Sequence, residues 1–185
     1  TAMTEERLRI EHERDYDMLT GLYNRKAFNR TCESLFRAPS RLGHAALMML
    51  DLDNLKALND AYGHDTGDRY IRETGRTLHD AMTGNSVCSR LSGDEFMVLF
   101  YGYDSRAQLR RDLNSLQSRL RRASIVLPNG DSFAVSISGG VAWYPEDGND
   151  MASLKKYADF AMYQVKRSHK GGMQEFDVGV YNEAS

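Results

Sequence analysis

The sequence predicts an α+β fold of the ferredoxin-like type, βαββαβ, in which an antiparallel sheet carries helices on one face. Three observations predict it. The chain has 185 residues and is 41% hydrophobic, which suits one domain with a proper core. Strand-like and helix-like apolar spacings follow one another in the order β, α, β, β, α, β. The run from 45 to 50 is apolar throughout, as in a buried central strand.

The opening of the chain differs in composition from the rest. Thr4 to Asp17 is charge-dense with few apolar positions, so a helix formed here would pack weakly on its own domain. We therefore expect three parts: a linker or stalk helix at 1–16, one domain at 17–177 and a short tail at 178–185.

The first core strand ends in acid, because Asp51-Leu52-Asp53 directly follows the apolar run. Two stretches with helical spacing come next, the first with Leu55, Leu58 and Tyr62, the second, after Gly63, with Ile71, Thr74, Leu78 and Met82. Asp65 is expected to cap the second of these helices.

The remaining elements are a hairpin, two helices and two strands. Two β-prone runs, 87–91 and 96–101, flank Ser92-Gly93-Asp94-Glu95, which predicts a hairpin with two carboxylates at its tip. An amphipathic helix and a strand broken near Gly139-Gly140 follow, marked respectively by Leu109, Leu113, Leu116, Leu120 and by Phe133, Val135, Ile137, Val141. An additional C-terminal helix over 154–165 and a short strand near 173–176 complete the prediction.

Composition excludes several classes of function. Lys+Arg 24 against Asp+Glu 26 leaves no general attraction to nucleic acid or to an anionic membrane. Cys32 and Cys88 lack metal-ligand spacing and are expected to be reduced core residues. No phosphate-binding P-loop, HExxH pair or CxxC pair is present. We expect no nucleic-acid partner, no direct membrane contact, and a cytoplasmic location, alone or as the cytoplasmic part of a larger membrane-bound protein.

The acidic positions suggest a metal site. In the ferredoxin-like order the first strand lies beside the hairpin, so Asp51 and the Asp94-Glu95 turn are expected to converge at one sheet edge. Facing carboxylates repel one another unless a cation lies between them, and oxygen ligands favour Mg²⁺, with Mn²⁺ as an alternative. The helix that begins near Asn54 offers free N–H groups to a phosphate. A plainer interpretation stays open, in which Asp51 and Asp53 cap that helix and Asp94 and Glu95 are turn residues without a functional role.

Five segments, in order along the chain, carry a family resemblance. They are Asp17-Met18-Leu19-Thr20-Gly21-Leu22-Tyr23-Asn24-Arg25; Asp51-Leu52-Asp53-Asn54-Leu55-Lys56 with Asn59-Asp60 and Gly63-His64-Asp65-Thr66-Gly67-Asp68; Arg90-Leu91-Ser92-Gly93-Asp94-Glu95-Phe96; Ser138-Gly139-Gly140-Val141-Ala142; and Ala158-Asp159-Phe160-Ala161-Met162-Tyr163-Gln164-Val165-Lys166. Together they resemble the motifs of GGDEF domains, the diguanylate cyclase family, from Asp17 to Lys170. The signature here is an SGDEF variant.

The resemblance implies a palm-like or nucleotidyl-cyclase-like core and an enzyme that joins two GTP into cyclic di-GMP, releasing pyrophosphate, as a facing homodimer. By position, Asp51, Asp94 and the carbonyl of Leu52 would bind magnesium. Glu95 would act near the ribose hydroxyl or a second metal, which makes Asp51, Asp94 and Glu95 the catalytic set. Asn59 and Asp68 would hydrogen-bond guanine. The other GTP-binding positions are Lys56, Lys166, Lys170, Asn54, Leu55 and Gly93.

Three departures from the family pattern matter. Ser92 replaces the first glycine of the signature, which costs about 1–2 kcal/mol if that position is left-handed. The alternative function is therefore a catalytically impaired domain that binds GTP as a regulatory module. Lys170 keeps a positive charge at the end of the last helix but not the bidentate fork of the family's arginine. Thr83-Gly84-Asn85-Ser86 stands where an R-x-x-D product-inhibition motif belongs, so no such site is expected.

Two expectations concern partners. The charged segment 1–16 suggests a helical stalk that connects the domain to an upstream sensor and sets the dimer. A third candidate function, a ferredoxin-like RNA-binding domain, is raised by the strand order and by the arginine-rich helix around Leu109 to Leu120. That helix has no interleaved aromatic residues, and the strands lack the aromatic motif that such domains use to stack bases.

Overall fold

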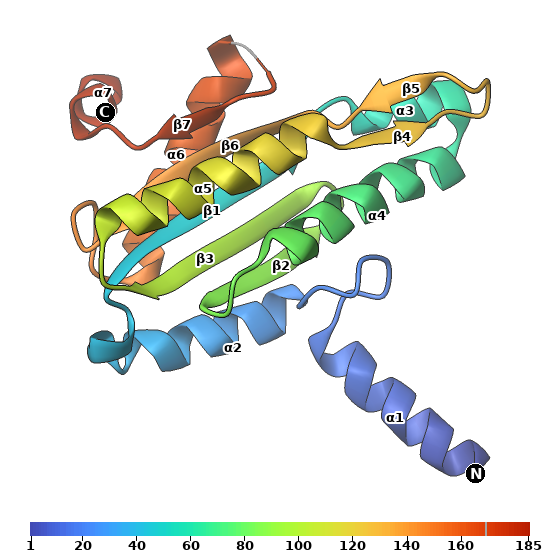
Figure 1. Ribbon diagram of the computed structural model, residues 1–185, viewed down its shortest axis with the longest axis horizontal. Helices are drawn as coiled ribbons and strands as arrows, with labels where there is room; N and C mark the ends of the chain where they lie inside the picture. The colour runs from blue at the N-terminus through green and yellow to red at the C-terminus, as the bar shows by residue number, and fades with distance from the viewer. Residues whose placement is uncertain (169) are drawn as a thin grey trace.

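The computed structural model describes residues 1–168 and 170–185 and is built around a five-stranded sheet (Figure 1). The strand order is β2-β3-β1-β6-β7, from β1 (His44–Leu52), β2 (Ser86–Ser92), β3 (Glu95–Tyr103), β6 (Ile137–Tyr144) and β7 (Met173–Glu175). β1 pairs antiparallel with both β3 and β6, whereas β7 runs parallel to β6. The α+β prediction and the ferredoxin-like strand order are confirmed, but the sheet is mixed rather than antiparallel throughout.

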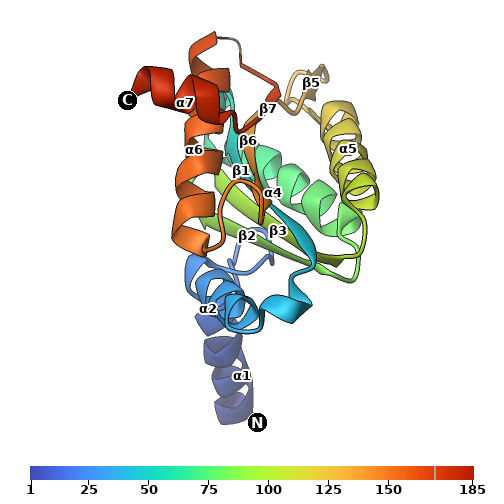
Figure 2. The same cartoon turned by 90° about the vertical axis from the view of Figure 1, so that its left-hand side faces the viewer.

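Helices cover both faces of the sheet rather than one, which corrects the expectation (Figure 2). On one face lie α4 (His64–Ala81) and α5 (Arg106–Arg122), and on the other lie α2 (Arg25–Phe36) and α6 (Met151–Ser168). Strand β1 divides its side chains between two buried clusters, with Ala46, Met48 and Leu50 in the first and Ala45, Leu47 and Met49 in the second. A strand that is apolar at every position is the pattern of a sheet covered on both faces.

Helix α2 is not among the elements predicted above, although its sequence signals it. Phe28, Cys32 and Leu35 follow helical spacing and are buried, and the side chain of Asn24 caps the helix by accepting from the backbone N–H of Ala27. Together with α6, this helix covers the second face of the sheet.

Several smaller elements surround this core. Helix α1 (Ala2–Asp15) buries no residue and projects away from the sheet (Figure 1). The others are the short helices η1 (Pro39–Arg41), α3 (Leu55–Tyr62) and α7 (Val178–Ala184), and a separate hairpin of β4 (Ser124–Val126) with β5 (Ser132–Ala134). Within the described residues, no helix has the length and apolar character needed to cross a membrane.

Two local expectations are wrong. Asp65 does not cap α4, because the helix already begins at His64 after Gly63; Asp65 lies in the first turn, where a negative charge favours the helix N-terminus. The strand expected from Phe133 to Val141 is split between β5 and β6, and β6 continues through its two glycines. A Cβ at Gly140 would lie 2.0 Å from the carbonyl oxygen of Ala158, so this glycine allows α6 to pack directly on the strand.

Candidate functional site at the carboxyl end of β1

The β1–β3 ladder brings the predicted acidic residues together. Asp51 lies opposite Glu95 in the register, and the N–H of Leu52, the last residue of β1, donates to the carbonyl oxygen of Asp94 over 2.9 Å. The carboxyl groups of Asp51 and Asp94 are close enough for the second to raise the pKa of the first. Residues 43 positions apart in sequence thus meet at one sheet edge, as the strand order led us to expect.

Electrostatics at this edge favour an added positive charge. Burial and, next, the contact with Asp94 raise the pKa of Asp51 to about 6, although Lys166 pulls it down. The Oδ1 atom of Asp51 is buried without a hydrogen-bond partner. The Nζ atom of Lys166, on α6, lies 2.9 Å from Asp51 Oδ2.

The donor set fits magnesium as an open site. Among the described residues, no three carboxylate, histidine or cysteine side chains form a closed metal cluster. Mg²⁺ is commonly held by one or two carboxylates, with phosphate and water oxygens filling the remaining positions. The pair Asp51 and Asp94, with the unpartnered Oδ1 of Asp51, meets that requirement.

Asp53 has a different environment from Asp51. It is 1% exposed and accepts hydrogen bonds from the hydroxyls of Ser136 and Ser138, each over 2.8 Å. Lys166 Nζ lies 3.8 Å from its Oδ1 atom. Asp53 therefore ties the end of β1 to the start of β6 and to α6. The plainer interpretation, in which Asp51 and Asp53 cap the following helix, is wrong, because the N-cap of α3 is Asn54 and no side chain caps that helix.

The start of α3 lies directly beyond the acidic edge. Asn54 has a left-handed backbone, with φ of 65°, and it turns the chain from β1 into the helix. Leu55 and Lys56 form the first turn, where backbone N–H groups have no intrahelical acceptor, and the Lys56 side chain is exposed. These positions can approach a phosphate group near Asp51 and Asp53.

Asn59 and Asp68, the predicted guanine pair, lie on neighbouring helices. The side chain of Asn59 packs against Gly67 in α4, where an added Cβ would lie 1.7 Å from Asn59 Oδ1. That oxygen is buried and has no hydrogen-bond partner. Asp68 follows Gly67 directly and is half-buried. A buried acceptor without a partner is suited to a ligand that offers N–H donors.

The hairpin tip places its positive φ on Gly93 and not on Ser92. Gly93 has φ of +38°, whereas Asn54 is the one non-glycine with positive φ among the described residues. Serine at the first signature position therefore imposes no left-handed strain. The Ser92 hydroxyl lies 3.5 Å from Oε2 of Glu95.

Arg90 and Asp17 hold the hairpin, a role that the sequence patterns did not reveal. The Nε and a terminal nitrogen of Arg90 both donate to the carbonyl oxygen of Gly93, over 3.0 and 2.9 Å. Its other terminal nitrogen pairs with Asp17 Oδ1 at 3.1 Å, and Asp17 also accepts from the N–H and hydroxyl of Thr20. Asp17 and Arg90 are 73 residues apart, so their shared membership of family motifs was the available signal.

Two other predicted features are Lys170 and the segment 83–86. Lys170 is exposed in the bend after α6, whereas Lys166 is the lysine in contact with Asp51. His169, between them in the family's closing motif, lies outside the described residues. In the segment 83–86, the hydroxyl of Ser86 donates to the carbonyl of Thr83 over 2.6 Å, so these polar groups are engaged locally. The expected absence of a product-inhibition site there stays a prediction.

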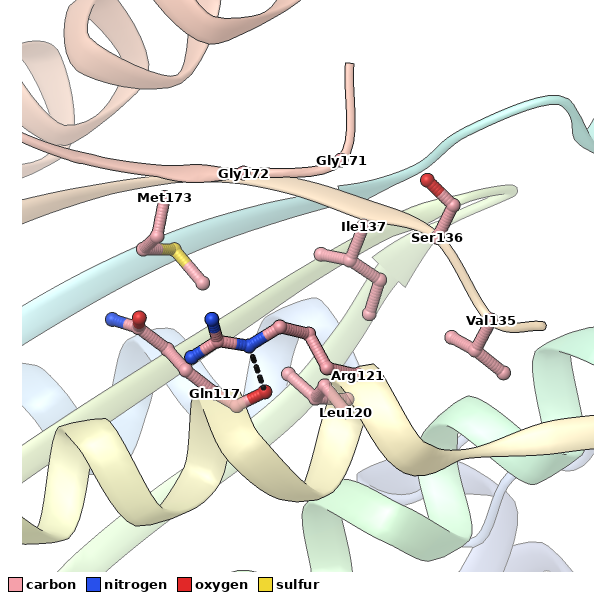
Figure 3. Close-up of a pocket in the computed structure, with 9 residues that line it drawn as sticks. All are labelled: Gln117, Leu120, Arg121, Val135, Ser136, Ile137, Gly171, Gly172 and Met173. Atoms are coloured by element: carbon pink, nitrogen blue, oxygen red, sulfur yellow. Dashed lines mark hydrogen bonds between the residues drawn. The ribbon is translucent and has the colours of Figure 1, made fainter.

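A hollow of about 150 Å³ lies between α5 and the strands β6 and β7 (Figure 3). Its walls are mostly apolar, with Gln117 and Arg121 of α5 on one side and Ser136 on the other. Arg121 donates to the carbonyl of Gln117 within its own helix. The hollow contains no carboxylate, so it does not compete with the edge at Asp51 as the place where a metal would bind.

The family model described as "Diguanylate cyclase, GGDEF domain" matches residues 14–172. Among solved structures, the isolated GGDEF domain of TpbB (YfiN) from Pseudomonas aeruginosa superposes with a TM-score of 0.81 at 29% identity, covering 91% of this chain and 98% of that one.

Relatives with named activities differ from one another. The diguanylate cyclase DgcP of Escherichia coli (strain K12) is 34% identical over 158 residues, 83% of this chain and 45% of DgcP. The cyclic di-GMP phosphodiesterase NbdA of Pseudomonas aeruginosa is 34% identical over 166 residues, 87% of this chain and 20% of NbdA. The chain spans less than half the length of these relatives.

Proposed function

The chain belongs to the GGDEF family of diguanylate cyclase domains, and we propose that it condenses two GTP molecules into cyclic di-GMP with release of two pyrophosphates. The observation that carries the proposal is the contact between Asp51 and Asp94 at an edge with too little positive charge. The proposed substrate is GTP because the side-chain oxygen of Asn59 is unpartnered and packs against Gly67, the residue before Asp68. Guanine presents N–H donors at the edge that such a pair would recognise.

In the proposed reaction, the ribose 3′-oxygen of one GTP forms a bond to the α-phosphorus of the other, and the bond from that phosphorus to pyrophosphate breaks. The same step in the opposite sense closes the ring. Magnesium, held by Asp51, Asp94 and the carbonyl of Leu52, would supply Lewis-acid polarisation of the α-phosphate. Glu95 lies opposite Asp51 in the ladder, on the catalytic edge, and would orient the attacking hydroxyl or accept its proton.

The other residues of the site would position the nucleotide. Asn59 and Asp68 would hold guanine between α3 and α4. The first turn of α3, from Asn54 to Lys56, would donate to the triphosphate, with Gly93 leaving room at the hairpin. Lys166 would move from Asp51 toward the phosphates, and Lys170 would approach them from the bend after α6. Such positioning and charge neutralisation are most of what phosphoryl transfer requires from a protein.

Two facing domains are needed, because each holds one GTP in this proposal. Helix α1 would set that arrangement, since it buries no residue of its own domain and exposes Met3, Leu8 and Ile10. Deletion of residues 1–14 should then lower the rate of cyclic di-GMP formation more at low protein concentration than at high concentration. A rate ratio that is the same at every concentration would count against the stalk. An upstream sensor in the full-length protein is part of this proposal.

The central experiment is nucleotide chromatography after incubation of the dimeric protein with GTP and magnesium. We expect a cyclic di-GMP product from the natural sequence and a loss of about 100-fold or more in Asp94→Ala, because one of the two metal carboxylates is removed. Circular dichroism should show that both proteins are folded. A folded, dimeric natural protein that forms no cyclic di-GMP would contradict the cyclase function.

A second candidate is a regulatory module that binds GTP without turnover. It is supported by the Ser92 hydroxyl, 3.5 Å from Oε2 of Glu95, and by the resemblance to NbdA, which is named as a phosphodiesterase. Titration calorimetry that shows one GTP bound per domain, together with no product by chromatography, would favour this function over the first.

A further inference from the structure

A second hollow borders the acidic edge on the face covered by α2 and α6. It has a volume of about 280 Å³, and Glu95 forms part of its wall. Met49 and Met97, from the central strands, line it as well and belong to the buried cluster on that face. The inference drawn from this hollow rests on the proposed function, in which Glu95 acts at the attacking hydroxyl.

The walls of this hollow carry more positive than negative charge. Arg25, the first residue of α2, and Lys155 and Lys156 of α6 contribute three cations, against the carboxylates of Glu95 and Asp159. We call the three cations and the space between them the basic pocket. A net positive wall next to the acidic edge is suited to an anion that must come close to Glu95.

The three cations are held to different extents. Lys155 is half-buried, and its Nζ donates to the side-chain oxygen of Asn29 over 2.8 Å. Lys156 is exposed, with its Nζ 5.5 Å from the centre of the Tyr181 ring of α7. Arg25 is exposed at the start of α2. Lys155 is therefore largely a structural link between α2 and α6, and Arg25 and Lys156 are the groups that can turn toward a ligand.

The chain's own nucleotide does not need this pocket. In the proposed function its guanine lies between α3 and α4, and its triphosphate reaches the start of α3 and Lys166. The basic pocket lies between the N-terminal parts of α2 and α6, with Glu95 in its wall, whereas Lys166 is in the last turn of α6. In the proposed function, Glu95 lies at the ribose hydroxyl of the chain's own GTP. That hydroxyl attacks the α-phosphate of the GTP held by the facing domain. The phosphates near Glu95 on the side of the basic pocket would therefore belong to the partner's GTP.

We propose that the basic pocket, through Arg25 and Lys156, binds the triphosphate of the GTP held by a second copy of this chain. The two domains then exchange contacts reciprocally, each placing its nucleotide against the partner's cations. Arginine can grip phosphate oxygens with two parallel donors, and the positive charge stabilises the pyrophosphate as it leaves. The nucleotide itself becomes part of the dimer interface.

The test is sedimentation velocity with magnesium and α,β-methylene-GTP, an analogue that binds like GTP but cannot release pyrophosphate. In the natural sequence the analogue should strengthen self-association. Arg25→Ala and Lys156→Ala should each weaken the analogue-dependent part by about tenfold, the size expected for a lost charged contact at an interface. Lys26→Ala is the matched control, because Lys26 is the exposed neighbour of Arg25 on α2 and does not line the pocket.

Binding of the analogue to dilute, monomeric protein is measured in parallel by fluorescence. We expect the affinity of both variants to stay within about twofold of the natural protein, because the pocket serves the partner's nucleotide. The inference is overturned if the analogue does not promote association, if Lys26→Ala weakens it equally, or if the variants lose affinity as monomers. A natural protein that associates with the analogue but makes no cyclic di-GMP would refute the cyclase function alone, and the variants would still decide the role of the pocket.

Discussion

The two ends of the central sheet differ in whether their charged side chains form ion pairs. At the end where β1 begins, Arg106 pairs with Glu146, and Arg110 pairs with Glu175 at 2.9 Å. Both guanidinium groups also lie over the ring of Trp143, 3.9 and 4.9 Å from its centre. We call this the paired end. At the other end, where β1 finishes, lie Asp51, Asp53, Asp94 and Glu95, which we call the acidic end.

The acidic end has too few cations for its carboxylates. Lys166 contacts Asp51 and approaches Asp53, and in the part of the chain that the structure describes neither Asp94 nor Glu95 forms an ion pair. Ion pairs between different elements, as at the paired end, hold those elements together. Carboxylates gathered without matching cations oppose folding unless a ligand completes them. The contrast separates a structural end from a functional one.

The substitution with the largest expected effect is Asp51→Asn, which tests whether the acidic end binds a metal rather than stabilising the fold. We expect the affinity for Mn²⁺, used as a spectroscopic substitute for Mg²⁺, to fall by about 100-fold because one of two charged ligands is lost. The same change should raise the free energy of unfolding of the metal-free protein by on the order of 1 kcal/mol, since burial and Asp94 oppose the Asp51 charge. Electron paramagnetic resonance and urea denaturation measure the two effects. A variant that loses metal affinity and stability together would show that Asp51 is a structural residue.

The next effect is the pH dependence of the acidic end. The folded protein holds the Asp51 proton more tightly than the unfolded chain, because its pKa is about 6 instead of 3.8. The contribution of Asp51 to stability is therefore fully present below pH 3.8 and is lost as the pH rises to about 6. Metal binding requires the ionised form, so Mn²⁺ affinity should fall by about tenfold per pH unit below pH 6 and be level above it.

Titrations at pH 5, 6 and 7 measure this dependence, with Asp51→Asn as the control for stability. The difference in stability between the variant and the natural protein should vanish near pH 4. If the difference has the same size at pH 4 and pH 7, the raised pKa is not its cause.

At the paired end, Arg106→Ala should act in the reverse sense. The loss of the ion pair with Glu146 and of the contact with Trp143 should lower the free energy of unfolding by about 1 kcal/mol. Mn²⁺ affinity and the rate of cyclic di-GMP formation should be unchanged, because Arg106 is remote from the acidic end. A loss of metal affinity in this variant would show that the two ends are coupled through the sheet.

The two ends also differ in what the sequence can reveal. The meeting of Asp51 with Asp94 follows from strand order, because the strand that ends in Asp51 must lie beside the hairpin. The links from Asp53 to Ser136 and Ser138 join residues 83 and 85 positions apart, and no spacing rule connects a carboxylate with such distant hydroxyls. At the paired end, the same arginines suggested a solvated or RNA-binding helix, because their partner Trp143 comes from a distant strand.

Ser92→Gly has the smallest expected effect. It tests how far the activity of the acidic end depends on the first residue of the signature. Ser92 has no positive φ, whereas Gly93 next to it has φ of +38°. Glycine at 92 therefore relieves no strain and should lower the free energy of unfolding by about 0.5 kcal/mol through backbone entropy, with a cyclase rate within about threefold of the natural one. Gly93→Ala, the matched variant, should lose more stability, on the order of 1–2 kcal/mol, because alanine resists the left-handed region. Urea denaturation and product chromatography compare the two.

A rise of tenfold or more in the rate of cyclic di-GMP formation for Ser92→Gly would contradict this expectation. It would mean that the serine hydroxyl, 3.5 Å from Glu95, restrains the catalytic carboxylate. The regulatory-module function would then become the better account of the natural sequence.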